Sequence, residues 1–223
     1  MKKILLVALL TGAMVVSLVS CSPSSTNEEN KKIEQTQNEE NNAFIGQGEW
    51  ANDYTREEVI SLNDEISERI EEKCNFYGLE YIKEEKFSEE NGETVSDKFI
   101  YFDNLNPEPN RMESMNYGFK TYGSDISKGS LGLKIGFRLD LNQIKEEDKF
   151  DFKETSISAF SEAMTNDTER DYTELNEKII DIVKNQNSNG TIETNLDGLV
   201  ETITIKDEFL LYKLDSKTYD FKK

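Results

Sequence analysis

Carboxylates are the most numerous side chains in this sequence that could perform acid–base chemistry. The chain has 45 Asp and Glu residues against 26 Lys and Arg, with a formal net charge of −19. Hydrolases that cleave glycosidic bonds use two carboxyl groups about 5 to 9 Å apart, one with a raised pKa. Adjacent pairs such as Glu71–Glu72, Glu84–Glu85 and Glu146–Glu147 arise from this composition alone. A carboxylate-based hydrolase therefore remains an alternative, but the sequence identifies no particular pair of carboxylates as catalytic.

Several other kinds of chemistry are excluded by what the sequence lacks. The 223 residues include no histidine, so the usual proton shuttle near neutral pH and the imidazole ligands of most catalytic zinc sites are missing. There is no Gly-x-Ser-x-Gly elbow, Ser-x-x-Lys pair, Walker loop or dinucleotide fingerprint. The excess of acids also argues against nucleic acid as a partner, because phosphate binding needs clustered Lys and Arg.

Residues 185–192 resemble the first eight positions of an EF-hand calcium loop. Oxygen-bearing side chains stand at loop positions one, three and five, and they are Asn185, Asn187 and Asn189. The resemblance fails at both strong anionic ligands, because position one is Asn instead of Asp and position twelve is Leu196 instead of Glu. We interpret the segment as the stop signal of a helix, where Asn and Gly accept the left-handed conformation, and expect no metal there.

The candidate binding face lies in residues 130–141, the most regular stretch of the chain. Apolar residues occupy every odd position from Leu131 to Leu141, which predicts a half-buried strand at the centre of the fold. The opposite face carries Gly132, Lys134, Gly136 and Arg138. Glycine weakens a strand interior unless a backbone, a ring or a ligand approaches closely. This face is either a shallow site for an anion or a peptide, or a packed surface with glycines under a helix and cations paired with acidic neighbours.

The N-terminus has the features of an export signal. Lys2 and Lys3 precede an apolar run, which ends in Leu18-Val19-Ser20-Cys21. This order resembles the type II signal peptide of bacterial lipoproteins, whose lipobox ends in a lipidated cysteine. The resemblance implies that residues 1–20 are removed and that Cys21 carries diacylglycerol and palmitate. More than one acyl chain gives stable anchoring, so the chain is expected at the outer face of the bacterial cytoplasmic membrane with its domain outside the cytoplasm.

The remaining chain divides into a tether and a single domain. Residues 21–49 begin with the lipidated Cys and are mostly Ser, Thr, Asn, Gln, Glu and Lys, which predicts a disordered polar tether. Residues 50–223 contain enough apolar residues for one α+β domain. Its first helix starts with a capping box of Thr55 and Glu58 and stops at Gly78. Cys74 lies on the apolar stripe of this helix, which favours a buried residue over a nucleophile.

The pattern after this helix predicts strands, then helices, then strands again. Residues 79–88 and 94–103 flank Asn91–Gly92, a sequence typical of a type I′ hairpin turn. Further strands are expected at residues 111–122, 131–141, 199–206 and 209–214, and helices at 154–165 and 172–186. The prediction is an antiparallel sheet of about six strands, with one N-terminal helix and a two-helix insertion packed on it.

These features predict a membrane-anchored extracytoplasmic lipoprotein that acts as a non-catalytic binding or interaction module at the cell envelope. Its partner would be an envelope protein, a peptide or a small ligand, and no cofactor is expected beyond the lipid on Cys21. One alternative is a cell-envelope hydrolase, identifiable by two carboxylates facing each other in a cleft. The other is an immunity or assembly lipoprotein, identifiable by an exposed aromatic patch instead of an enclosed pocket.

Overall fold

Strand β4 (Lys128–Arg138) lies in the middle of the sheet, as its alternating sequence predicts. The computed structural model describes residues 54–196 and 198–222. In it, the odd residues of β4 from Leu131 to Phe137 are at most 3% exposed. The strand ends three residues earlier than predicted, because the Asp140 carboxylate accepts hydrogen bonds from the backbone of Asn142 and Gln143. This N-cap starts helix α3 (Leu141–Glu147) where the sequence pattern suggested more strand.

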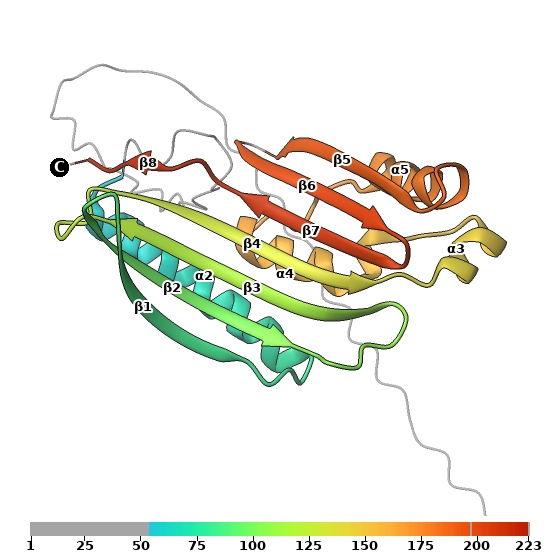
Figure 1. The fold of residues 1–223 in the computed structure, drawn as a ribbon, viewed down its shortest axis with the longest axis horizontal. Coiled ribbons are helices and arrows are strands. Elements are labelled where there is room, and N and C mark those ends of the chain that lie inside the picture. Colours follow the sequence, from blue (N-terminus) through green and yellow to red (C-terminus); the bar gives the residue numbers. More distant parts are fainter. Residues whose placement is uncertain (1–53, 197, 223) are drawn as a thin grey trace, which may run out of the picture. The chain divides into compact units, whose positions relative to one another are not determined.

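All eight strands in the described residues form one antiparallel sheet (Figure 1). Their order is β1-β2-β3-β4-β7-β6-β5, and β8 pairs with the start of β4. The α+β class is therefore confirmed, but the predicted count of about six strands is too low. The other strands are β1 (Ile82–Glu90), β2 (Glu93–Asp103), β3 (Arg111–Tyr122), β5 (Asn189–Leu196), β6 (Leu199–Lys206), β7 (Phe209–Asp215) and β8 (Tyr219–Asp220).

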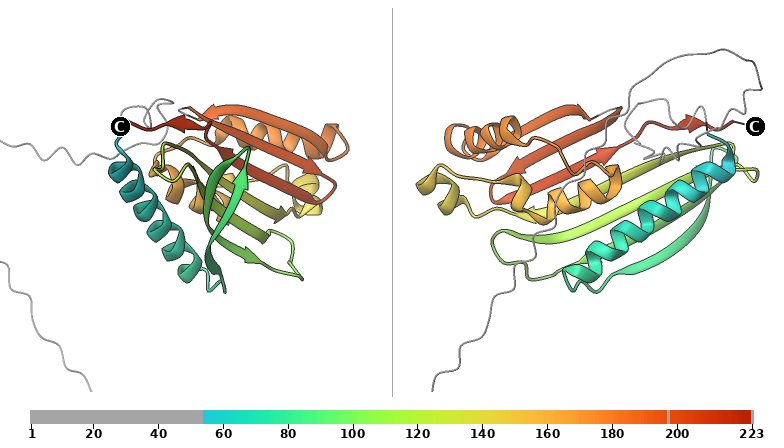
Figure 2. Two further views of the ribbon diagram at one scale, coloured as in Figure 1. Left: turned by 60° about the vertical axis from the view of Figure 1, so that its left-hand side comes forward. Right: turned by 180° about the vertical axis from the view of Figure 1, so that it is seen from behind.

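The helices cover one face of this sheet and leave the other face open (Figure 2). They are α2 (Arg56–Phe76), α3, a 3-10 turn η2 (Phe152–Glu154), α4 (Ser156–Thr165) and α5 (Thr173–Asn185). The insertion between β4 and β5 thus holds α3 and η2 in addition to the two predicted helices. Both extra elements are too short to show a helical period in the sequence.

Helix α2 follows its sequence prediction closely. The Thr55 backbone N–H donates to Glu58 Oε2 at 2.7 Å, and the Glu58 N–H donates to Thr55 Oγ1 at 3.3 Å. Gly78 adopts a φ of +66° just beyond the helix, where a residue with a Cβ would be strained. The apolar stripe is buried against the sheet, and it consists of Val59, Leu62, Ile66, Ile70 and Cys74.

The fold contains two successive units in which helix is followed by an antiparallel meander. Helix α2 is followed by the meander β1 to β4, and helices α4 and α5 are followed by the meander β5 to β7. The last long strand of each half meets the other at an antiparallel seam, where residues 132–138 of β4 pair with residues 209–215 of β7. The two halves therefore share one continuous sheet, and their helices share one core.

A buried polar network holds the second half together. The guanidinium of Arg170, in the α4–α5 connection, binds both carboxylate oxygens of Glu201 on β6 at 2.6 and 2.7 Å. Thr194 on β5 and Tyr212 on β7 also donate to Glu201, at 2.7 and 3.0 Å. The Tyr212 hydroxyl lies 2.8 Å from Ser161 Oγ on α4, so three strands, one helix and one connection meet here.

This network keeps Glu201 ionised although its side chain is 1% exposed. Burial raises the pKa of the Glu201 carboxyl, but the hydrogen bonds and charge of Arg170 and the hydrogen bonds from Thr194 and Tyr212 outweigh it. The net result is a pKa below the usual range. A carboxyl with a lowered native pKa stabilises the fold above the pKa of the unfolded state and loses that contribution as the pH falls.

We predict that Arg170→Leu lowers the free energy of unfolding by about 3 to 5 kcal/mol at neutral pH, because it leaves the Glu201 charge buried and unpaired. The loss should shrink as the pH falls from 7 to about 4, because burial raises the pKa of the unpaired Glu201 carboxyl in the variant and protonation removes its charge, whereas wild type keeps its ion pair until the pH falls through the lowered pKa of Glu201. Urea denaturation at pH 7 and pH 4 measures both values. Adding Glu201→Leu should recover much of the loss, and a loss independent of pH would contradict the role given to the ion pair.

Candidate functional site

A large cavity in the described part of the chain lies at the end of the sheet where β2 and β4 stop and β3 begins. Its volume is about 810 Å³, which is within the usual range for ligand sites. Strand ends, the C-terminus of α2, helix α3 and the chain leading through η2 into α4 surround it. Each wall belongs to a separate part of the sequence, so only the folded chain creates this end cavity.

The inner part of the end cavity is apolar. Phe102, Met112 and Phe137 reach it from the core face of β2, β3 and β4, and Ile144 reaches it from α3. Tyr77 closes the α2 side, and its ring stacks on Phe160 with 6.1 Å between ring centroids. Burial raises the pKa of the Tyr77 hydroxyl, and the negative charge of Glu162 adds to the effect, so this group is a neutral donor at physiological pH.

Carboxamide side chains surround the apolar part. They are Asn104, Asn106 and Asn110 in the β2–β3 connection and Gln143 on α3. A carboxamide both donates and accepts hydrogen bonds, as a peptide group does. The rim of the end cavity is thus suited to a ligand that carries amide or hydroxyl groups around an apolar centre.

Asn110 fixes the shape of this rim. Its φ is +57°, a left-handed conformation that Asn tolerates better than most residues with a Cβ. Its Nδ2 donates to Gln143 Oε1 at 2.9 Å, and its Oδ1 accepts from the Asp140 backbone N–H at 3.1 Å. One side chain therefore joins the β2–β3 connection to the start of α3.

Charged groups complete the lining of the end cavity. Three carboxylates line it, those of Glu108, Asp151 and Glu154, together with the cations Arg111 and Lys149. The Arg111 guanidinium donates to the Asn110 carbonyl at 3.3 Å, and Asp151 Oδ1 accepts from the Lys153 backbone N–H at 3.0 Å. These carboxylates are the acid–base groups that the end cavity offers.

Two strongly exposed apolar side chains stand beside the mouth of the end cavity. Phe76 is 80% exposed and contacts Tyr77 edge to face, with 5.1 Å between ring centroids. Leu105 is 86% exposed and lies between two lining residues, Asn104 and Asn106. Folding gains nothing from exposing these side chains, so the mouth offers apolar area to another molecule.

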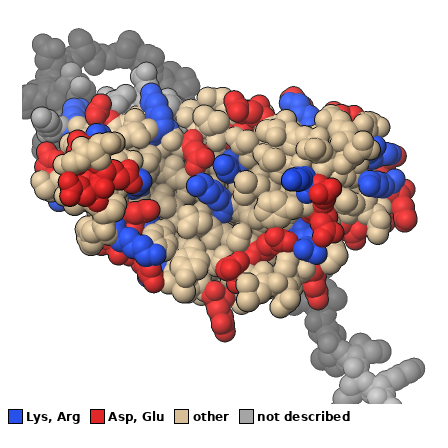
Figure 3. Space-filling view, in the orientation of Figure 1, with Lys and Arg blue, Asp and Glu red and all other residues tan. Residues whose placement is uncertain are grey.

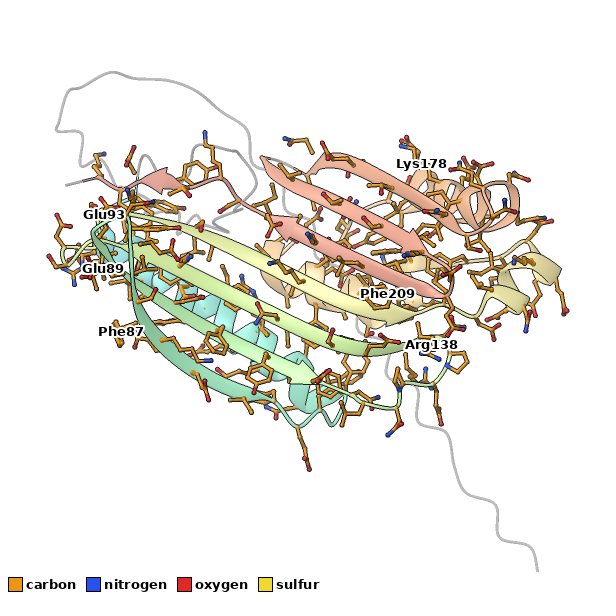
Figure 4. The ribbon with its side chains drawn as sticks, viewed as in Figure 1. Phe87, Glu89, Glu93, Arg138, Lys178 and Phe209 are labelled. Atoms are coloured by element: carbon orange, nitrogen blue, oxygen red, sulfur yellow. The ribbon has the colours of Figure 1, made fainter. Side chains whose placement is uncertain are left out.

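The predicted face of β4 divides into two parts in the structure. Arg138 is already paired, with Nε 3.2 Å from Glu113 Oε1 and Nη1 3.1 Å from Glu208 Oε1. Gly136 is covered by Ser114 and Phe209, because a Cβ there would lie 2.8 Å from the Ser114 hydroxyl and 3.1 Å from the Phe209 ring. Figure 4 shows Arg138 and Phe209 together at this end of the sheet. Gly136 thus lets a hydroxyl and an aromatic ring approach closely on the open face, and it does not lie under a helix.

The other part of the predicted face remains accessible. Lys134 is exposed and stands opposite Lys213 across the seam. A Cβ on Gly132 would lie 2.7 Å from Asp215 Oδ1. Burial raises the pKa of the Asp215 carboxyl, and the two lysines oppose this shift. Lys134 therefore lies among charges of both signs, with Lys213 opposite it and the Asp215 carboxylate nearby. Figure 3 shows Lys, Arg, Asp and Glu interspersed over this face of the molecule.

The EF-hand-like residues act as the end of a helix. Asn185 is the last residue of α5, Asn187 and Ser188 have φ values of +52° and +54°, and Asn189 begins β5. The Asn185 amide donates to Asp181 Oδ1 at 2.8 Å. Within residues 54–196 and 198–222, no group of three or more Cys, Asp or Glu side chains is placed to hold a metal ion.

Of the two cysteines, only Cys74 lies in the described part of the chain. Cys21, the predicted lipid attachment site, lies outside the described residues, as do the predicted signal peptide and tether. Cys74 is buried on α2, and burial raises the pKa of its thiol to about 11. The expectation that Cys74 is a buried residue of the helix stripe is therefore confirmed. In the described parts of the chain, no helix is both long and apolar enough to cross a membrane.

Comparison with known proteins identifies no relative. Models of protein families, curated protein sequences and solved structures were all searched, and none matches the chain. The geometry of the chain itself is therefore the basis for its function.

Sequence reasoning missed the end cavity because its walls lie far apart in the chain. The available signal was the Asn-rich connection 104–110, which carries two prolines and one leucine.

We predict that Asn110→Gly lowers the free energy of unfolding by about 1 to 2 kcal/mol, because two side-chain hydrogen bonds are lost. Asn110→Ala should cost about 1 kcal/mol more, because alanine is strained at positive φ and glycine is not. Chemical denaturation of the three proteins measures the difference. Equal stabilities of the two variants would show that the left-handed conformation of Asn110 is not required.

Proposed function

We propose that this protein is a lipid-anchored binding module of the cell envelope, and that its end cavity holds a segment of a partner protein. The observation that carries the proposal is the combination of an apolar interior, a rim of four carboxamides and exposed Phe76 and Leu105 at the mouth. The partner would place an apolar side chain inside and its peptide groups against the rim.

The size of the end cavity supports a peptide segment as the occupant. About 810 Å³ accommodates a few residues, and the mouth extends the contact to the exposed side chains around it. Aromatic and large apolar residues dominate the binding energy of protein interfaces when they become buried there. Phe76 and Leu105 are suited to this role because burial would remove both from water.

The lipid anchor would place this site outside the cytoplasm. The lipobox at residues 18–21 predicts attachment through Cys21, and the polar segment 21–49 would separate the domain from the bilayer. The net charge of −19 would repel the domain from anionic lipid. A site on such a domain can reach partners beyond the membrane surface.

We predict that a photo-cross-linking residue at position 105 forms a discrete adduct with one protein in intact cells. The same residue at Phe87, which is 70% exposed at the other end of the sheet (Figure 4), should form none. Asn104→Trp should reduce the adduct at least fivefold by filling the end cavity, whereas Asn116→Trp on the open face should not. Gel shifts and mass spectrometry measure the yield and identify the partner.

The proposal would be wrong if positions 87 and 105 gave the same adducts, or if Asn104→Trp left the yield unchanged.

A second candidate function, a carboxylate-based hydrolase, is favoured by Glu108, Asp151 and Glu154 in one cavity. It predicts a cleaved partner in the adduct and an intact partner after Glu108→Gln or Glu154→Gln. An intact partner with the wild-type carboxylates supports binding without hydrolysis.

We predict that Cys21→Ala moves the protein from the membrane fraction to the soluble fraction, because the acyl chains can no longer be attached. Cys74→Ala is the matched control, since Cys74 is buried in the core and should not affect anchoring. Cell fractionation with immunoblotting measures the distribution. Unchanged membrane retention of Cys21→Ala would refute the lipobox interpretation.

A further inference from the structure

The outer edge of β5 is a second surface that can take a partner. Strand β5 ends the sheet on the side opposite β1, and no strand in the described residues pairs with its outer side. Six of the nine residues of β1 are charged, against one of the eight residues of β5. Charges on an edge strand hinder pairing with another chain, so the β1 edge is protected and the β5 edge is not.

A groove of about 550 Å³ runs beside this unprotected edge. Its walls are β5 on one side and α5 with its C-cap residue Gln186 on the other. Ile182 and Ile192 are buried at its base. At the start of β5 the walls meet, because a Cβ on Gly190 would lie 2.9 Å from Ile182. An extended chain along β5 would direct alternate side chains into this groove and onto the open face.

The groove is acidic. Glu174, Glu177, Asp181 and Glu193 line it, and the one lining cation, Lys178, pairs with Glu174 at 2.6 Å. Figure 4 shows Lys178 on α5. Hydrogen bonds from Asn185 and Gln186 lower the pKa of the Asp181 carboxyl, so this group stays ionised. The groove therefore complements Lys or Arg side chains.

We propose that the β5 edge binds an extended, basic segment of a partner protein, which joins the sheet as an additional strand beside β5. Main-chain hydrogen bonds would give the affinity, and the acidic groove would select alternate basic side chains. A second copy of this chain is a poor occupant, because each copy carries a net charge of −19 and presents the same acidic groove. This site is independent of the end cavity.

The test uses the full chain and a capped eight-residue peptide in which Lys alternates with Val. The peptide should bind in calorimetry and slow hydrogen exchange of the backbone amides in residues 189–196. The double variant Glu177→Lys and Glu193→Lys should weaken binding at least tenfold. The matched control is Glu84→Lys with Glu89→Lys, which makes the same change of net charge at the β1 edge and should weaken binding less than threefold.

Three outcomes would overturn the proposal. Equal weakening by both double variants would show attraction to the net charge alone. Slowed exchange in residues 82–90 instead of 189–196 would place the added strand at β1. An alternating Glu and Val peptide should not bind, and binding of that peptide would contradict selection by the acidic groove. Circular dichroism of each variant confirms that it is folded before the affinities are compared.

Discussion

The antiparallel seam between β4 and β7 is the contact on which the rest of the structure depends. It pairs Leu133 with Leu214, Ile135 with Tyr212 and Phe137 with Leu210 on the core face. A shift of β7 by one residue would turn Leu210, Tyr212 and Leu214 to the open face. It would also move Tyr212 away from Glu201, to which its hydroxyl now donates. The register of the seam thus fixes both the shared core and the buried polar network.

The open side of the seam explains why β4 contains glycine at positions 132 and 136. Gly136 leaves room for the Phe209 ring, and Gly132 leaves room for the Asp215 carboxylate. A ring over a strand glycine covers backbone that would otherwise lose packing. Asp215 is the β7 partner of Gly132, whereas Phe209 pairs with Arg138 and its ring reaches Gly136 from there, so the exposed face of β4 is shaped by its pairing with β7. The glycines on the even positions of β4, which resembled part of a binding face, are thus largely explained by the packing of β7 side chains over them.

Local signals predicted most of the fold. The capping box of Thr55 and Glu58, the Asn91–Gly92 turn and the alternation in β4 each specify their own element, and all three are confirmed. Strand β5 was missed because its eight residues follow directly on an Asn-rich helix stop. The end cavity and the β5–α5 groove could not be predicted, because each is made by segments whose proximity depends on the seam and not on local sequence.

The same construction explains where binding can occur. Helices close one face of the sheet, and Arg69 on α2 joins two of them by donating to the Ala163 carbonyl of α4 at 2.7 Å. A partner that contacts the described sheet itself can therefore reach the open face, the ends of the strands and the two edges. The open face is mixed in charge, and the β1 edge is blocked by charge. The end cavity and the β5 edge remain, one in each half of the sheet, so two partners could bind without competing for the same residues.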